Sequence, residues 1–276
     1  MKISIVYPEH FKMFYSQLAL AFKDCLEQLG HTVIVVHNVN ESTELEFNFC
    51  PLHYDKFIKI HGKKYIMFQM EQFPTKFCAT AWQGHKWNKT KEFINLYDSV
   101  WDTYYEFHKD LYTEYKIPVY DFKLGYHQSF DLYKETLKDK DASFFGSMSD
   151  RRRAVLSKLH KFNVAVESAV TDDDRARLVN QTRVNLNIHY SDSNLIESLR
   201  IIVFLLSSKA FVLTEDFIGD DELKKCVFVS NEQEFAAHID FYKNHEVERN
   251  KFANEAYNYL KTHRTLFQAI KNCMEV

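Results

Sequence analysis

The chain has 276 residues, of which 46% are apolar and 26% charged, a balance that excludes an intrinsically disordered protein. Its net charge of −3 lacks the overall basic signature that nucleic-acid-binding proteins carry. Five cysteines without a Cys-x-x-Cys pair indicate neither a disulfide framework nor a zinc ribbon. The start of the chain lacks the apolar run of a signal peptide, and no stretch approaches the ~18 apolar residues of a membrane span. We therefore expect a cytoplasmic protein without membrane insertion.

The first part of the chain alternates between strand and helix patterns. Residues 2–7 form a β-branched apolar run, residues 14–30 carry apolar residues at helical spacing up to Gly30, and residues 31–38 form a second apolar run. Strand, helix and strand in this order predict a βαβ unit and hence a parallel sheet. Further strands are expected at 64–71, 99–104 and 117–127, with helices at 90–98 and 105–115. The chain has no Gly-x-Gly-x-x-Gly, so the fingerprint of a dinucleotide cofactor is absent.

A charged segment with little apolar periodicity, 131–142, separates this part from a second alternation. We place the domain boundary inside it and expect domains of 1–133 and 134–276. The second domain has predicted strands at 143–147, 163–170, 183–190, 210–215 and 225–230, and predicted helices at 149–162, 171–182, 195–208, 231–245 and 246–276. The expected fold class is therefore α/β, with two doubly wound Rossmann-like domains that face a cleft.

The stretch "FFGSMSDRRR" joins a predicted strand to a predicted helix that is capped by Ser149 or Asp150. Ligands of open α/β sheets bind beyond the carboxyl ends of the strands, and a helix N-terminus offers free N–H groups to an anion. Gly146 and Ser147 would let the backbone approach a phosphate. Arg151 and Arg152 would add guanidinium contacts, although three successive arginines cannot all face one site. The alternative is a solvated run of arginines at the start of a helix.

A second strand–loop–helix junction, "VNLNIHYSDSNLIESLR", covers residues 184–200. We expect the N–H groups of residues 194–196 to form a second anion cradle at the start of the helix, and Glu197 to accept hydrogen bonds from sugar or ribose hydroxyls. The candidate substrate-binding residues of this stretch are His189, Tyr190, Asn194, Leu195, Glu197 and Arg200. Two alternatives stay open: His189 is a packed structural residue, and Glu197 pairs only with Arg200, three positions later.

From Trp101 to Asp216 the order "VWDTY…LGYH…FFGSMSDRRRAVLSKL…VNLNIHYSDSNLIESLR…AFVLTED" resembles small nucleotide-sugar glycosyltransferases of the GT-B fold. These include bacterial and phage members related to the spore-maturation type of glycosyltransferase. The likeness rests on the Gly-Ser turn with its arginines, the Leu-Asn-Ile-His-Tyr strand, and the Leu-Glu-x-x-Arg-Ile helix with Ile196 added before Glu197. The resemblance implies that the C-terminal domain binds a nucleoside-diphosphate sugar as co-substrate, that the N-terminal domain binds the acceptor, and that no further cofactor is needed.

The chain departs from the family pattern at two positions. Many retaining members carry a second Glu farther along the helix that begins near Glu197, where this chain is apolar around Phe204. A Gly usually precedes the next strand, where this chain has Lys209. The resemblance therefore implies the class of enzyme. It leaves open whether transfer inverts or retains configuration, and whether Glu197 contacts the sugar or the ribose.

Sugar transfer requires that the leaving diphosphate be stabilised, and fixed N–H groups and guanidiniums do this without a metal. The chain has no clean Asp-x-Asp motif, and the acidic run 172–174 reads as a capped helix start, so we expect no metal site. An inverting enzyme also needs a base for the acceptor's proton. Glu9, His10 and Glu71 lie at predicted strand ends of the first domain, and His10 and Glu71 are our candidates, with a surface or packing role as the alternative. In a retaining enzyme Glu71 would only orient the acceptor.

The acceptor is open among a glycan, a protein and a modified DNA base. A Lys-, Asn- and Phe-rich composition suggests an AT-rich genome such as that of a phage. Duplex DNA requires a positive track, for which Lys56, Lys59, Lys63 and Lys64 are candidates, with solvated surface as the alternative. Two other classes compete with the transferase: a nucleotide- or sugar-binding protein without turnover, and a nucleotide-sugar epimerase, which usually has a longer chain.

Overall fold

A computed structural model of the chain describes residues 1–38, 42–49, 57, 59–75, 81–168 and 171–275. Its contacts group the chain into two compact units. Unit 1 comprises Met1–Leu124 and Leu266–Val276, and unit 2 comprises Gly125–Thr265. The last helix, α9 (Leu266–Met274), packs against α1 (Lys12–Gln28) and so belongs to unit 1, whereas the sequence placed it with the second domain.

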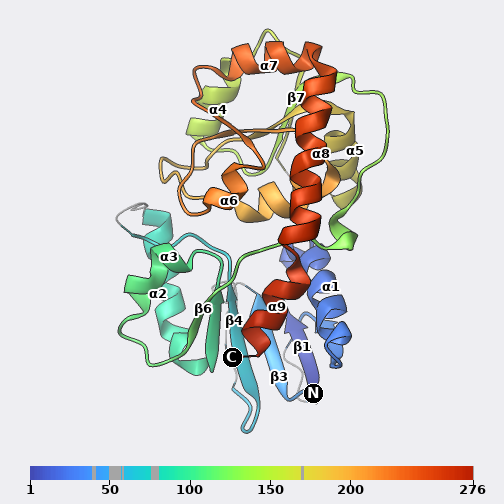
Figure 1. The fold of residues 1–276 in the computed structure, drawn as a ribbon. Coiled ribbons are helices and arrows are strands. Elements are labelled where there is room, and N and C mark those ends of the chain that lie inside the picture. Colours follow the sequence, from blue (N-terminus) through green and yellow to red (C-terminus); the bar gives the residue numbers. More distant parts are fainter. Residues whose placement is uncertain (39–41, 50–56, 58, 76–80, 169–170, 276) are drawn as a thin grey trace. The chain divides into compact units, whose positions relative to one another are not determined.

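Unit 1 is built on a parallel sheet with the strand order β2-β1-β3-β4-β5-β6 (Figure 1). The strands are β1 (Lys2–Val6), β2 (Thr32–Val36), β3 (Leu45–Phe49), β4 (Lys64–Gln69), β5 (Ser99–Asp102) and β6 (Val119–Asp121). All neighbouring pairs are parallel. Five of the six strands fall inside runs that the sequence predicted, so the parallel sheet is confirmed.

The strand that the sequence did not predict, β3, lies in the middle of this sheet between β1 and β4. Its sequence alternates apolar residues with Glu46 and Asn48, which is typical of a strand with one wet face. Both polar side chains are nevertheless buried, because the Lys63 ammonium donates to the Glu46 carboxylate over 2.6 Å and the Asn48 amide donates to the same carboxylate over 3.3 Å. A buried ion pair has made a polar sequence fit a central strand.

Helices cover both faces of the unit 1 sheet. The connection through α1 runs from β1 outward to β2, whereas α2 (Ala81–Phe93) and α3 (Tyr105–His108) lie on connections that run the other way, from β4 to β5 and β6. Since such crossovers are right-handed, the two directions place the helices on opposite faces. The helix predicted at 90–98 begins earlier, at Ala81, and gives way to a 3₁₀ turn, η3 (Ile94–Leu96), because Trp87 anchors it in the core against Phe73.

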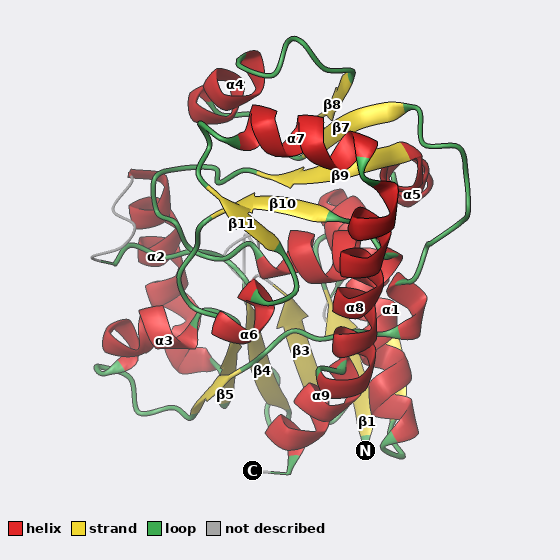
Figure 2. Ribbon diagram, turned by 45° about the horizontal axis from the view of Figure 1, so that its top comes forward, coloured by secondary structure: helices red, strands yellow, loops and turns green. Residues whose placement is uncertain are grey.

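Unit 2 has its own parallel sheet, with the order β11-β10-β9-β7-β8 (Figures 1 and 2). The strands are β7 (Lys140–Phe145), β8 (Val164–Glu167), β9 (Thr182–Asn187), β10 (Val212–Glu215) and β11 (Phe228–Ser230). The helices are α4 (Asp150–Ser157), α5 (Asp172–Gln181), α6 (Asp221–Lys224), α7 (Phe235–Asn244) and α8 (Glu246–His263). All five strands and four of these helices were predicted; α6 was not.

One apolar core holds α4 and α7 on a common face of this sheet. Val155 of α4 and Ile239 of α7 pack with Phe144 of β7 and Leu186 of β9 in a single buried cluster, and Figure 2 shows both helices beside these strands. Burial of such side chains contributes roughly 1.5–3 kcal/mol each. The core therefore fixes the first turn of α4 relative to the ends of β7 and β9.

The predicted fold class is confirmed for each unit: both are α/β with a parallel sheet and helices packed on it, as in Rossmann-like domains. Among the described helices, none is long and apolar enough to cross a bilayer.

Candidate functional site

Three neighbouring strands of unit 2 end at the same edge of its sheet. β9 pairs in parallel with β7 on one side and with β10 on the other. Gly146 follows β7, His189 comes shortly after β9, and Glu215 ends β10. Because ligands of open α/β sheets bind beyond the carboxyl ends of the strands, this edge is the place to look for a site.

The turn after β7 is shaped by a glycine. Gly146 has a φ of 135°, a left-handed conformation that side chains rarely adopt. A Cβ at this position would lie 2.5 Å from Nη2 of Arg200, so the guanidinium rests directly on the glycine backbone. Ser149 then caps α4 by accepting a hydrogen bond from the Arg152 N–H over 3.2 Å. Of the two caps that the sequence offered, the structure uses Ser149.

Arg152 is buried, with 2% of its surface exposed. Its Nε donates to the Ile188 carbonyl over 2.8 Å, its Nη1 donates to the Ser147 carbonyl over 2.7 Å, and its Nη2 donates to Oε1 of Glu197 over 2.7 Å. The guanidinium therefore joins the turn after β7, the end of β9 and the loop that carries Glu197. The Tyr190 ring, which is 46% exposed, covers it, with Cζ 5.3 Å from the ring centroid.

Glu197 lies between two arginines. Oε1 pairs with Arg152, and Oε2 lies 3.0 Å from Nη1 of Arg200. The Tyr190 N–H adds a hydrogen bond to Oε1 over 3.2 Å. Burial by itself would raise the pKa of Glu197, but the charges of Arg200 and Arg152, with a smaller contribution from His189, outweigh it and hold that pKa below its ordinary value. The alternative in which Glu197 pairs only with Arg200 is therefore wrong, since Glu197 pairs with Arg200 and with Arg152.

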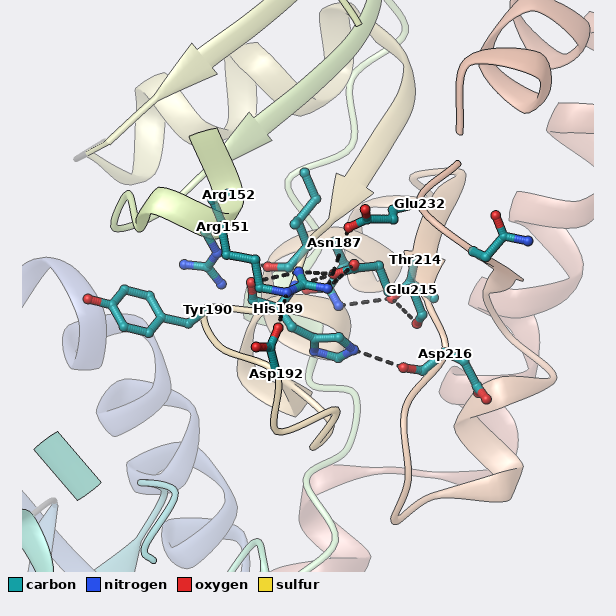
Figure 3. A network of polar contacts seen from close by, with 12 residues as sticks. Arg151, Arg152, Asn187, His189, Tyr190, Asp192, Thr214, Glu215, Asp216 and Glu232 are labelled. Atoms are coloured by element: carbon teal, nitrogen blue, oxygen red, sulfur yellow. Dashed lines mark hydrogen bonds and ion pairs between the residues drawn. The ribbon is translucent and has the colours of Figure 1, made fainter. Parts of the chain in front are cut away.

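Arg151 faces a different set of carboxylates (Figure 3). It makes a bidentate pair with Glu215 over 2.9 and 2.6 Å, and its Nε donates to Asp192 over 2.8 Å. Glu232 lies 3.7 Å from Nη2. Arg153, by contrast, is exposed and pairs with Asp150 of its own helix. The expectation that three successive arginines cannot share one site is confirmed, since each has different partners.

His189 is 1% exposed and well fixed. Its N–H donates to Glu215 over 2.7 Å, and its Nε2 donates to the Asp216 carbonyl over 3.0 Å, since a carbonyl can only accept (Figure 3). Nδ1 is buried without a partner among the described residues. In the neutral ring Nδ1 is therefore an acceptor. His189 lies at the same strand end as Glu215, and its burial also fits the alternative of a packed structural residue.

The second anion cradle was predicted wrongly. Residues 194–196 do not begin a helix: Leu195 forms an isolated parallel bridge with Ile218, and Asn194 has a φ of 49°. The helical segment begins later, as the π-helix η6 (Leu199–Leu205), with Ser198 in the position before it. Pairing with a residue more than twenty positions away along the chain has replaced the first helical turn. Asn194 and Leu195 shortly precede Glu197 in the sequence, but their N–H groups do not form a helix N-terminus.

The two departures from the family pattern have structural counterparts. The Phe204 ring packs under Arg175, with its centroid 3.8 Å from Cζ, so an arginine covers this part of η6. Lys209 has a φ of 53° and ends the 3₁₀ turn η7 (Leu206–Ser208), so the position does require the left-handed backbone that glycine adopts most easily.

The base candidates lie in unit 1. His10 is exposed on the 3₁₀ turn η1 (Glu9–Phe11) after β1, with its ring 4.4 Å from that of Phe11. Glu9 is exposed on the same turn. Glu71 is half-buried after β4, and its carbonyl accepts a hydrogen bond from the Gln69 amide over 2.7 Å. β3 lies between β1 and β4, so His10 and Glu71 follow two strands that are not neighbours, both at the carboxyl ends of the sheet.

A second polar cluster in unit 1 is closed to ligands. Asp102 accepts hydrogen bonds from the Tyr104 N–H, from Nδ1 of His108 over 2.8 Å and from the Tyr112 hydroxyl. Nε2 of His108 accepts the Phe73 N–H over 3.1 Å, which makes this histidine neutral with its proton on Nδ1. Asp102 and His108 are fully buried, so we assign the cluster to the core.

The predicted lysine track is not supported. Lys63 is buried against Glu46, and Lys59 lies 3.8 Å from Asp98. Lys64 begins β4 and is exposed, whereas Lys56 lies outside the described residues. The segment also precedes β4, at the amino end of the strands rather than at the ligand-binding edge.

The acidic run 172–174 opens α5, as predicted. Thr171 caps the helix by accepting the Asp174 N–H over 3.2 Å, and Asp172 and Asp174 pair with Arg175 and Arg177. Within the described part of the chain, no group of three or more His, Cys, Asp or Glu side chains is arranged to hold a metal ion.

Sequence reasoning missed the acidic partners of Arg151. Asp192, Glu215 and Glu232 come from three segments that are far from Arg151 in the chain. Glu215 had a signal, since it ends the predicted strand "AFVLTE" beside two other strand ends. Asp192 and Glu232 had none, because their approach depends on the folded sheet.

The family model described as "Glycosyl transferase-like" matches residues 131–274, which is more than half of the chain and includes the polar residues at the carboxyl edge of the unit 2 sheet. The chain belongs to this family. The glycosyltransferase class that the sequence predicted is thereby confirmed. An uncharacterised protein of Acanthamoeba polyphaga mimivirus is 34% identical over 95 residues, and this match spans 33% of the chain and 31% of that relative. The match therefore covers about a third of each protein.

Solved structures share the fold over the full length of the chain. An α-glucosyltransferase in complex with UDP and a 13-mer DNA containing a HMU base aligns with a TM-score of 0.71 at 8% identity, covering 100% of the chain and 98% of that structure. The T4 phage BGT in complex with UDP and Mn²⁺ aligns with a TM-score of 0.66 at 12% identity, covering 100% and 99%. At these identities the likeness shows the fold, which is the predicted GT-B arrangement of two Rossmann-like domains.

Proposed function

We propose that the chain transfers a sugar from a nucleoside diphosphate to an acceptor, and that the donor binds at the carboxyl edge of the unit 2 sheet. One observation carries this proposal: the Gly146 turn, the Arg200 guanidinium and the ionised Glu197 meet at adjacent strand ends. A turn and helix N-terminus attract phosphate, a guanidinium neutralises it, and a fixed carboxylate accepts hydrogen bonds from hydroxyls. A sugar nucleotide contains all the groups that these residues recognise.

The diphosphate is proposed to lie over the turn from Gly146 to Ser149. The first N–H groups of an α-helix have no partner within the helix. In α4 the Ser149 side chain accepts the Arg152 N–H as a cap. Arg200 lies against Gly146, so its guanidinium brings positive charge to this turn. Glu197 faces the hydroxyls of the sugar or the ribose, and His189 and Tyr190 line the same edge.

In the proposed reaction the bond between C1 of the sugar and the β-phosphate oxygen breaks, and a bond from C1 to an acceptor oxygen forms. The electron pair of the broken bond leaves with the diphosphate, where N–H groups and Arg200 stabilise the new charge. If transfer inverts configuration, the acceptor's proton passes to a base, for which His10 and Glu71 remain the proposed candidates. If transfer retains configuration, the proton passes to the departing phosphate oxygen and no enzymic base is needed.

We propose UDP-glucose as the first donor and a hydroxymethylated pyrimidine in DNA as the first acceptor to test. The support is the fold shared with an α-glucosyltransferase that was solved with UDP and a 13-mer DNA containing a HMU base. A glycan or a protein remains an alternative acceptor. Binding of a nucleotide without turnover is the alternative function.

We also propose that transfer needs no divalent metal, because Arg200 and the start of α4 already bring positive charge to the diphosphate. The T4 phage structure with UDP and Mn²⁺ is the reason to test this directly. Loss of activity in EDTA that Mn²⁺ restores would contradict the proposal.

The decisive experiment incubates the protein with UDP-glucose and with duplex DNA that carries 5-hydroxymethyl pyrimidines, and follows UDP release together with the mass of the DNA. A gain of one hexose that depends on both substrates is expected. Parallel reactions with GDP-, TDP- and ADP-glucose and with oligosaccharide acceptors identify another specificity. If UDP, GDP, TDP and ADP all fail to raise the melting temperature and no donor is turned over, the proposed function is wrong.

A further inference from the structure

Two adjacent arginines of α4 differ in what they hold. Arg151 is partly exposed and reaches Asp192, a residue that is 96% exposed in its side chain. Arg152 is almost completely buried and reaches two backbone carbonyls and Glu197. The sequence suggested the same role, phosphate binding, for both. The contacts suggest different roles.

We propose that Arg152 is a positioning residue that places and orients Glu197 for the donor's hydroxyls, and that it does not itself contact the diphosphate. This inference rests on the proposed function for its effect on the donor. Its structural part, the control of Glu197 by Arg152, stands on the contacts alone.

The hydrogen bonds of Arg152 occupy its whole guanidinium. All three nitrogens of the Arg152 guanidinium donate to acceptors 2.7–2.8 Å away, and these acceptors belong to three different segments. A phosphate that displaced any of them would leave a buried carbonyl or carboxylate without a partner, which is unfavourable. Nη2 of Arg200, by contrast, lies directly against Gly146, where the diphosphate is proposed to bind.

The charged groups around Glu197 come from three different elements. The groups that face Glu197 are Arg152 from α4, Arg200 from η6 and His189 from the end of β9. Both arginines contact different oxygens of the carboxylate, so each fixes one side of it. Without Arg152 the carboxylate would keep Arg200 on Oε2 but only the uncharged Tyr190 N–H, at 3.2 Å, on Oε1, so that side would be held less firmly.

The first test needs no ligand. Carboxyl carbon signals of the protein, recorded by NMR during acid titration, identify Glu197 as the signal lost in Glu197→Gln. In Arg152→Gln we expect its pKa to rise by about 1–3 pH units, because an opposite charge in contact is removed. Arg153→Gln is the matched control on the same helix, and it should leave the pKa of Glu197 unchanged. An unchanged value in Arg152→Gln would overturn the inference.

The second test is a double-mutant cycle on UDP-glucose affinity, measured by calorimetry. If Arg152 acts through Glu197, then Arg152→Gln and Glu197→Gln each weaken binding by about ten- to a hundredfold, and the double variant is within about threefold of the weaker single variant. If Arg152 binds phosphate directly, the two losses multiply. Multiplying losses would overturn the inference.

Should Arg152→Gln fail to fold, Glu197→Gln is added to Arg200→Gln and compared with Arg200→Gln alone, with UDP as the probe, so that Arg152 is the one arginine left beside residue 197. The added change removes the counter-charge of Arg152 and leaves its guanidinium in place. Direct phosphate binding then predicts tighter UDP binding, whereas a positioning role predicts no gain. If wild-type protein binds neither UDP nor UDP-glucose, the proposed function fails, while the NMR titration still tests the link between Arg152 and Glu197.

Discussion

Among the largely buried ion pairs of the described residues, one in each unit lies at an end of its sheet, and the two ends are opposite. In unit 1, Lys63 and Glu46 pair over 2.6 Å beside the amino ends of β3 and β4, with side chains that are 2% and 0% exposed. In unit 2, Arg152 and Glu197 pair over 2.7 Å beyond the carboxyl ends of β7 and β9, with side chains that are 3% and 16% exposed.

The two pairs have similar chemistry, and their positions in the sheets separate a structural role from a functional one. The Lys63–Glu46 pair makes a polar sequence acceptable in the middle strand of a sheet, and the amino edge of a parallel sheet is not where ligands bind. The Arg152–Glu197 pair lies at the ligand-binding edge, beside the Gly146 turn, Arg200 and a buried His189 nitrogen without a partner among the described residues. The first pair should therefore control stability and the second should control binding.

The largest expected effect is on stability, from Lys63→Met. This change leaves the Glu46 carboxylate buried without its counter-charge, which costs about 3–5 kcal/mol in the free energy of unfolding. Urea denaturation measures it. Lys59→Met is the control, because the exposed Lys59–Asp98 pair contributes at most about 1 kcal/mol. A structural role for the Lys63–Glu46 pair would be wrong if the two variants had equal free energies of unfolding. It would also be wrong if Lys63→Met kept the wild-type free energy of unfolding but lost UDP binding.

The next effect is on donor binding, from Glu197→Gln. The variant keeps the shape of the side chain and one acceptor oxygen but loses the charge, so donor hydroxyls lose about 1.5–3 kcal/mol, or ten- to a hundredfold in the affinity for UDP-glucose. Calorimetry with UDP and with UDP-glucose separates two contacts. Weakening of UDP-glucose alone indicates the sugar, and equal weakening of both indicates the ribose. Wild-type affinity for both would return Glu197 to a structural role.

Gly146→Ala should act on both stability and binding. The backbone conformation of Gly146 is unfavourable for alanine, and the new Cβ would meet the Arg200 guanidinium at 2.5 Å. We expect a loss of about 1–3 kcal/mol in the free energy of unfolding, together with weaker UDP binding because Arg200 must move. Gly30→Ala is the control: it also has a positive φ, but its Cβ would meet nothing within 4 Å. If both variants bind UDP alike, the Gly146 turn does not hold the diphosphate.

The smallest effect is on the pH dependence of stability. The pKa of Glu197 lies below its ordinary value in the folded protein, so its ionisation stabilises the fold above the unfolded value and this contribution is lost as the pH falls through the folded value. The stability difference between wild type and Glu197→Gln should therefore shrink as the pH falls below the ordinary pKa of a glutamate, by no more than about 1.4 kcal/mol per pH unit. A difference that stays constant over this range would show that Glu197 has no special environment.

The sequence predicted those parts of the fold that depend on local pattern. Short apolar runs located ten of the eleven strands that the structure describes, and the cap of α4 was narrowed to Ser149 or Asp150. The missing strand, β3, was hidden because its acidic and amide side chains are neutralised by Lys63, which lies on another segment. Local pattern contains no information about such a partner.

The same limit applies to the site. The Gly146 turn was predicted and the Glu197–Arg200 pair was considered as an alternative, because both follow from short spacings, whereas the helix start at Asn194 was wrong because Leu195 pairs with the distant Ile218. The different surroundings of Arg151 and Arg152 could not be predicted either, since their carboxylates arrive from other strand ends and loops. Residue types therefore indicated the chemistry, and only the folded sheet distinguished which arginine faces which acid.

We propose that the diphosphate lies on the Gly146 turn, and the affinity of Arg200→Gln for UDP is the measurement that decides this. The variant removes the guanidinium that rests on Gly146 and leaves the Arg152–Glu197 pair intact. Calorimetry should show UDP affinity lowered about ten- to a hundredfold relative to wild type, as expected for a lost charge-assisted contact. Arg153→Gln, on an exposed position of α4, should bind UDP as wild type does. Equal dissociation constants for wild type and Arg200→Gln would contradict the account.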